Sequence, residues 1–179
     1  MIYLYAIIKI LTFPGSVIRA AMEQSACRKH KIPVEDENPF RFDELCGHVE
    51  HELPDNRKAA ASIVIRPFLF NLIVGFFVLT AASVSVYAVG DYSAVDVFLF
   101  WLGISLWTNV FPSLESGSNY LFLAKNDSSG IAKFIAKFMQ IGSVLDSWSL
   151  TLPLALLCSY ALPFLFGLCF QFLSGTGNF

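Results

Sequence analysis

A run of 24 residues from Pro67 to Gly90 contains no charged side chain. A helix needs about 20 predominantly apolar residues to cross the hydrocarbon core of a bilayer, so this run is long enough to span one. Only 15% of all residues are charged and 55% are hydrophobic, whereas soluble domains carry about 25% charged residues. The sequence therefore predicts an all-α integral membrane protein that forms a single domain.

Three further apolar segments complete a predicted set of about four membrane spans. They lie near residues 2–27, 97–114 and 147–174. The first segment is interrupted by Phe13-Pro14-Gly15. Because proline is favoured in the first turn of a helix, a new helix is expected to begin near Pro14.

Polar segments separate these spans. Residues 28–58 form a polar loop that is dense in charge of both signs, and the alternating pattern from Cys46 to His51 predicts a small β element within it. A second loop, rich in Ser, Asn and Gly, is predicted from Gly117 to Gly130. Residues 131–140 are amphipathic, with Lys133 and Lys137 on one face. This pattern fits a helix on the membrane surface or the charged start of the last span, and both interpretations stay open.

The distribution of Lys and Arg predicts the orientation of the chain. These residues are concentrated in the loop at 28–58 and recur at 125–137, and none lies between Pro67 and Tyr120. Cytoplasmic loops carry an excess of positive charge, so we expect the loop at 28–58 in the cytoplasm and both termini on the opposite side. The expected location is the cytoplasmic membrane of a prokaryote.

Two charged residues fall inside an apolar helix candidate that starts at Phe13. Arg19 and Glu23 are four residues apart, which places them on one helical face. Ionisable residues inside a membrane helix are expensive and indicate a functional site. The pair is therefore the predicted centre of the functional site.

Four short motifs occur in a fixed order along the chain. They are Phe13-Pro14-Gly15, the sequence GHVEHELP from Gly47 to Pro54, the sequence PFLFN from Pro67 to Asn71, and the sequence NVFPS from Asn109 to Ser113. Together they resemble the small members of the site-2-protease superfamily, which are intramembrane zinc metalloproteases. The resemblance covers roughly Leu11 to Leu121 and implies the fold of that family.

The same resemblance implies that catalysis has been lost. In the family, the helix after FPG carries HExxH, whose two histidines bind zinc and whose glutamate is the general base. Arg19 and Glu23 stand at the histidine positions, Ala20 at the glutamate position and Ser116 at the third, acidic ligand. Arginine stays protonated and cannot bind a metal. We expect Arg19 to contact Glu23 and a polar network without metal or other cofactor, formed by Asn71, Asn109, Glu115 and Ser116.

Other functions are compatible with the sequence. One alternative is a divergent metal-dependent hydrolase, whose zinc would be held by Cys27, His30, Cys46, His48 and His51. A serine nucleophile at Ser16, Ser113 or Ser116 would lack a histidine within the spans. A small oligomeric transporter or channel component is a further alternative. No basic patch with interleaved aromatic residues points to nucleic acid, so the expected partners are the lipid bilayer and another membrane protein, for which the chain would be a binding or structural subunit.

Overall fold

A computed structural model of the chain describes residues 2–34, 49–90, 92–125 and 129–174. Its helices are α1 (Ile2–Leu11), α2 (Phe13–His30), α3 (Arg57–Ser83), the π-helical η1 (Val84–Val89), α4 (Ala94–Thr108), α5 (Leu114–Lys125), α6 (Gly130–Ser147) and α7 (Thr151–Ser174). The only strand pairing within the described residues is an isolated antiparallel bridge between Val34 and His51. The all-helical prediction is therefore confirmed, while half of the predicted β element, residues 46–48, lies outside the described residues.

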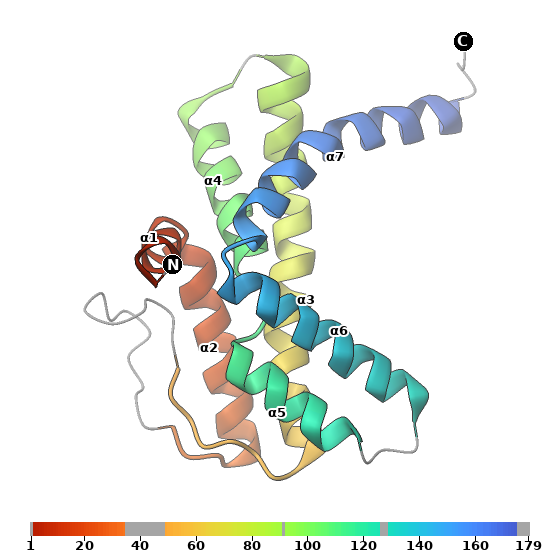
Figure 1. The fold of residues 1–179 in the computed structure, drawn as a ribbon. Helices are drawn as coiled ribbons and strands as arrows, with labels where there is room; N and C mark the ends of the chain where they lie inside the picture. The colour runs from red at the N-terminus through yellow and green to blue at the C-terminus, as the bar shows by residue number, and fades with distance from the viewer. Residues whose placement is uncertain (1, 35–48, 91, 126–128, 175–179) are drawn as a thin grey trace.

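The long helix α3 is the centre of the bundle. It packs against α2, α4, α5 and α7, and α6 packs against α5 (Figure 1). The C-terminal part of α7 leads away from this body (Figure 1). The middle of α2 faces the segment after α4 and the start of α5, and these parts carry residues of the candidate site.

The predicted first span consists of two helices that meet at a sharp bend. As expected, Pro14 occupies the first turn of α2, but α1 meets α2 at an angle of 89° at Thr12. Side chains of α4 satisfy the backbone of this corner, because the Ser105 hydroxyl accepts the Gly15 N–H and donates to the Thr12 carbonyl, both at 2.7 Å. A Cβ atom at Gly15 would collide with the Ser105 carbonyl, so glycine permits this close approach of α2 and α4.

One helix within the described residues is long and apolar enough to cross a membrane by itself. It consists of α3 and the start of η1, from Arg57 to Tyr87, and the mean hydropathy of its most apolar window is 2.1. Helix α3 thus starts ten residues before Pro67, which lies inside it. Two bent pairs, α1 with α2 and α6 with α7 (104°), raise the number of spans to at most three if each pair counts as one.

The predicted count of four spans is not confirmed. The predicted span at 97–114 corresponds to α4, which ends at Thr108 and is only 15 residues long. At 1.5 Å per residue, α4 covers about 22 Å, less than the hydrocarbon core of about 30 Å.

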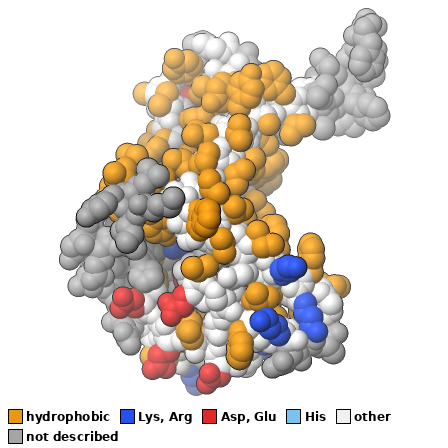
Figure 2. Space-filling view, viewed as in Figure 1, with side chains coloured by type: hydrophobic (Ala, Val, Ile, Leu, Met, Phe, Trp, Pro, Cys, Tyr) orange, Lys and Arg blue, Asp and Glu red, His pale blue; other side chains and the backbone are white. Residues whose placement is uncertain are grey.

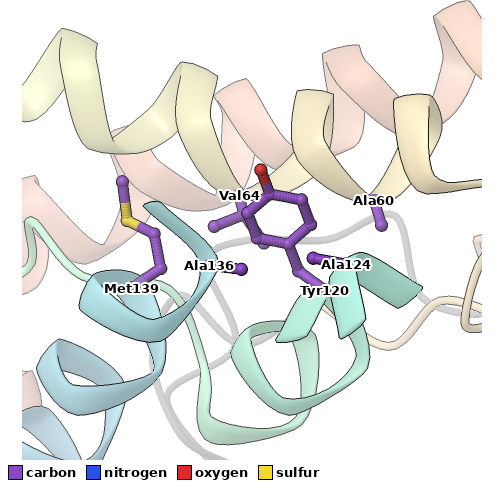
Figure 3. Close-up of a cluster of buried hydrophobic side chains, with 6 residues drawn as sticks. All are labelled: Ala60, Val64, Tyr120, Ala124, Ala136 and Met139. Carbon is purple, nitrogen blue, oxygen red and sulfur yellow. The ribbon is translucent and has the colours of Figure 1, made fainter. Parts of the chain in front are cut away.

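The loop predicted from Gly117 to Gly130 is wrong, because α5 extends to Lys125. Helix α5 buries a hydrophobic face against α3 and α6, as Figure 3 shows for the cluster Ala60, Val64, Tyr120, Ala124, Ala136 and Met139. Small residues allow these helices to approach closely, since a Cβ atom at Gly117 would press into Ser143 of α6. Burial of this face outweighs the low helix propensity of Ser, Asn and Gly.

Exposed apolar and charged side chains separate along the molecule. Hydrophobic side chains cover the upper and middle parts of the face in Figure 2, over α3, α4 and α7, while most charged side chains gather at the opposite end. That end of the molecule contains the end of α2 and the start of α3, together with the end of α5 and the start of α6 (Figure 1).

Candidate functional site

Helix α2 directs its two charged residues into the interior of the bundle. Arg19 and Glu23 are each only 4% exposed, and Ala20 between them is fully buried. The Arg19 Nη1 atom donates to the Phe111 carbonyl at 3.0 Å. Arg19 therefore reaches the backbone of the segment between α4 and α5. The expected contact of Arg19 with Glu23 stays a prediction.

Glu23 is held by two side chains that come from distant parts of the chain. Its Oε1 atom accepts a hydrogen bond from Ser116 Oγ at 3.2 Å and lies 3.3 Å from His51 Nε2. Ser116 Oγ and His51 Nε2 are themselves 3.5 Å apart. Glu23 and Ser116, which the resemblance assigns to two metal-ligand positions, thus lie in contact.

His51 is a member of this site that the sequence did not assign to Glu23. It lies in the polar loop and is anchored by its bridge to Val34 and by a contact of its Nδ1 atom with the Glu52 carbonyl at 2.9 Å. Because a carbonyl oxygen can only accept, Nδ1 is the donor in this contact. The other ring nitrogen, Nε2, faces Glu23. The signal in the sequence was the HExP part of the second motif, whose histidine was interpreted only as a possible zinc ligand.

The environment of His51 favours its charged form. Burial lowers the pKa of His51, but the hydrogen bonds to Glu23 and to the Glu52 carbonyl, together with the charges of Glu23 and Glu115, outweigh burial and raise the net pKa above its ordinary value of 6.5. A protonated His51 facing the Glu23 carboxylate is a buried ion pair.

A pocket of about 230 Å³ opens beside this ion pair. It is lined by Val49, Glu50, His51, Leu53, Ser113, Glu115 and Ser116. Glu115, a predicted network residue, therefore contributes to the wall next to Ser116. The carboxylates of Glu50 and Glu115 make this wall acidic.

The arrangement does not favour a serine nucleophile. No predicted span carries a histidine, but His51 of the polar loop lies with its Nε2 atom 3.5 Å from Ser116 Oγ. A general base must accept the proton of the hydroxyl, however, and the raised pKa of His51 favours the protonated ring, which has no nitrogen lone pair free to accept it. The other ring nitrogen is occupied by the Glu52 carbonyl.

A second buried ion pair, which the sequence did not predict, lies at the other side of Arg19. Lys9 Nζ donates to both carboxylate oxygens of Asp146 at 3.0 Å and to Asn109 Oδ1 at 2.7 Å. The Lys9 and Asp146 side chains are each 3% exposed. Both residues could have been singled out from the sequence as isolated charges, because Lys9 stands in an apolar segment and no charged residue follows Asp146.

The predicted network residues divide between these two clusters. Asn71 Nδ2 donates to the Asn109 carbonyl at 2.8 Å and to the Gly15 carbonyl at 3.3 Å, and Asn109 Nδ2 donates to the Thr12 carbonyl at 3.1 Å. The two asparagines thereby connect α3 and α4 to the α1–α2 corner and to Lys9. Ser116 belongs to the Glu23 cluster instead, with Glu115 beside it.

The alternative zinc ligands are not assembled in the part of the chain that the structure describes. Cys27 is fully buried among Ala26 and Ile63, and His51 is engaged with Glu23. His30 ends α2, while Cys46 and His48 lie outside the described residues. Across residues 2–34, 49–90, 92–125 and 129–174, no group of three or more His, Cys, Asp or Glu side chains is placed to hold a metal ion.

Comparison with known proteins adds no relative to this picture. No protein-family model, no curated protein and no solved structure matches the chain. The resemblance to site-2 proteases therefore depends on the four sequence motifs alone.

Proposed function

We propose that this chain is an integral membrane protein of site-2-protease-like architecture that has lost proteolytic chemistry and serves as a binding or structural subunit for another membrane protein. The observation that carries the proposal is the 3.2 Å contact between Glu23 Oε1 and Ser116 Oγ, which joins residues 93 positions apart. The motif comparison places metal ligands at these two positions. A chance similarity of short motifs would give no reason for the two residues to meet.

The side chains at this place support a role without peptide hydrolysis. Ala20 offers no proton acceptor at the position of the general base, and Arg19 brings a permanent positive charge where a zinc ligand would stand. The charged His51 lies against Glu23. Cationic side chains therefore supply positive charge that a metal would otherwise provide.

The distribution of surface side chains supports insertion in a membrane, and the excess of Lys and Arg in the loop at 28–58 supports a cytoplasmic position for that side. Charged side chains gather at the end where α2 finishes and α3 starts (Figure 2). Large apolar side chains such as Phe77, Phe98 and Leu157 are more than half exposed elsewhere. A surface of this kind is suited to lipid tails and to the transmembrane helix of a partner.

Restoring the metal ligands tests the proposal. The full-length variant Arg19→His/Glu23→His/Ser116→Asp, purified in detergent and equilibrated with zinc, should retain about one zinc ion per chain, because three protein ligands plus water complete a tetrahedral site. The matched control places the aspartate at the exposed Ser118 instead of Ser116. Zinc content measured by mass spectrometry should be low in the control and in the wild type, and equal zinc in all three proteins would refute the assignment of these positions.

Proteolysis provides a second readout. The wild-type protein should not cleave membrane-protein substrates, with or without added zinc. Chelator-sensitive cleavage by the wild type that is lost in Glu23→Gln would instead favour a divergent metal-dependent hydrolase.

A further inference from the structure

The exposed side of α6 is divided into an apolar strip and a basic strip. Ile131, Phe134 and Phe138 recur at helical spacing and are 74%, 72% and 45% exposed. Lys133 and Lys137, four residues apart, are also exposed and lie on the adjoining side of the helix. A third side, opposite to both strips, packs into the bundle. Water alone is a poor environment for such a strip, whereas the boundary between lipid tails and headgroups suits both halves.

The position of α6 against α3 gives independent evidence for this boundary. Ala136 of α6 packs in one cluster with Ala60 and Val64, which belong to the charged first third of α3. Ala60 precedes the charge-free stretch that starts at Pro67 by seven residues, or about 10 Å along the helix axis. Phe138 contacts Phe68 at the start of that stretch, with 6.0 Å between ring centroids. Helix α6 therefore crosses the level at which α3 changes from charged to apolar.

The charge of this surface specifies the headgroups that it fits. Lys125 at the end of α5 is exposed, like Lys133 and Lys137, and Figure 2 shows basic side chains gathered beside hydrophobic ones at the lower end of the molecule. The acidic residue of α6, Asp146, is buried at the far end against Lys9. The exposed start of α6 is thus purely basic, which is complementary to anionic lipids.

We propose that residues 130–141 form a lipid-binding surface that lies in the headgroup region of an anionic bilayer. Ile131, Phe134 and Phe138 enter the outer hydrocarbon, and Lys133 and Lys137 contact anionic headgroups. The inference rests on the membrane insertion contained in the proposed function. It adds a specific site and a specific class of lipid.

A fluorescent amino acid sensitive to its surroundings tests the inference in the full-length protein. Phe134→Anap is reconstituted in nanodiscs of phosphatidylcholine alone, or of phosphatidylcholine and phosphatidylglycerol in equal parts, each with or without a spin-labelled lipid quencher. The expected result is blue-shifted emission and lipid quenching that are strongest with phosphatidylglycerol. Phe77→Anap reports on α3 and should be quenched in both discs, while Asp55→Anap should report water in both.

Charge reversal identifies the contribution of the lysines. Each lysine near an anionic surface favours the surface-bound state by about fivefold, so Lys133→Glu/Lys137→Glu should abolish the effect of phosphatidylglycerol at position 134. The control Lys29→Glu/Lys58→Glu makes the same change of charge at exposed positions on α2 and α3 and should preserve the effect.

Three other outcomes would refute membrane insertion, the lipid-binding surface or the recognition of anionic lipid, respectively. Absence of quenching at position 77 refutes membrane insertion through α3, and with it the proposed function in its present form. Quenching at 77 together with a probe in water at 134 refutes only the lipid surface and leaves α6 free for a protein partner. Equal quenching at 134 in both discs, unaffected by the lysine variants, refutes recognition of anionic lipid.

Discussion

Removing one member of the Lys9–Asp146 pair should strongly destabilise the protein. Three acceptor atoms surround Lys9 Nζ, two of them on Asp146, so Asp146→Leu leaves two donors of a buried cation without partners. Hydrogen bonds to charged groups contribute about 1.5–3 kcal/mol each, which agrees with the loss of about 3–5 kcal/mol expected when one partner of a buried pair is removed. This is a large fraction of a typical stability of about 5–15 kcal/mol.

A double-mutant cycle measures the coupling between the two residues. Lys9→Met, Asp146→Leu and the combined variant are unfolded from mixed micelles by increasing the proportion of SDS, with helix content followed by circular dichroism. The combined variant should recover much of the loss, because neither charge is then left buried without its partner. Lys29→Met removes the same side chain from an exposed position and should change the free energy of unfolding by less than about 0.5 kcal/mol.

Additivity would refute this reasoning. If the loss in the combined variant equals the sum of the two single losses, Lys9 and Asp146 do not stabilise each other. The ion pair would then make no coupled contribution to holding α1 against the α6–α7 bend.

Two further predictions concern the Glu23 cluster and the α1–α2 corner. Because the pKa of His51 is raised in the folded protein, its pairing with Glu23 contributes stability that is complete at pH values below the ordinary pKa of 6.5 and is lost as the pH rises through the folded value. The free energy of unfolding, measured across this pH range, should decline in the wild type and change less in His51→Gln. Identical pH profiles of the two proteins would contradict the pair. Ser105→Ala deprives a buried backbone N–H of its acceptor and should lower the free energy of unfolding by about 1–3 kcal/mol, whereas Ser118→Ala at an exposed position should have little effect; a similar loss in both variants would argue against the corner contact.

The local sequence pattern alone was not sufficient to predict the whole candidate site around Glu23. The spacing of Arg19 and Glu23 was sufficient to place both on the buried face of α2, and the fourth motif led to Ser116. His51 was recognised only as a possible zinc ligand, because a histidine in a polar loop gives no sign of which carboxylate it will meet.

The sequence by itself determined the properties that depend on neighbouring residues. The start of α2 at Phe13 follows from Pro14, and the apolar character of α3 follows from the charge-free run after Pro67. Only the tertiary structure decided which distant residues meet. The break at Thr12 depends on hydrogen bonds from α4, and α5 forms a helix from a Ser- and Gly-rich segment because it buries a face against α3 and α6. Lys9 and Asp146 lie 137 residues apart, and the cost of burying each charge is offset only when the folded chain brings the two together.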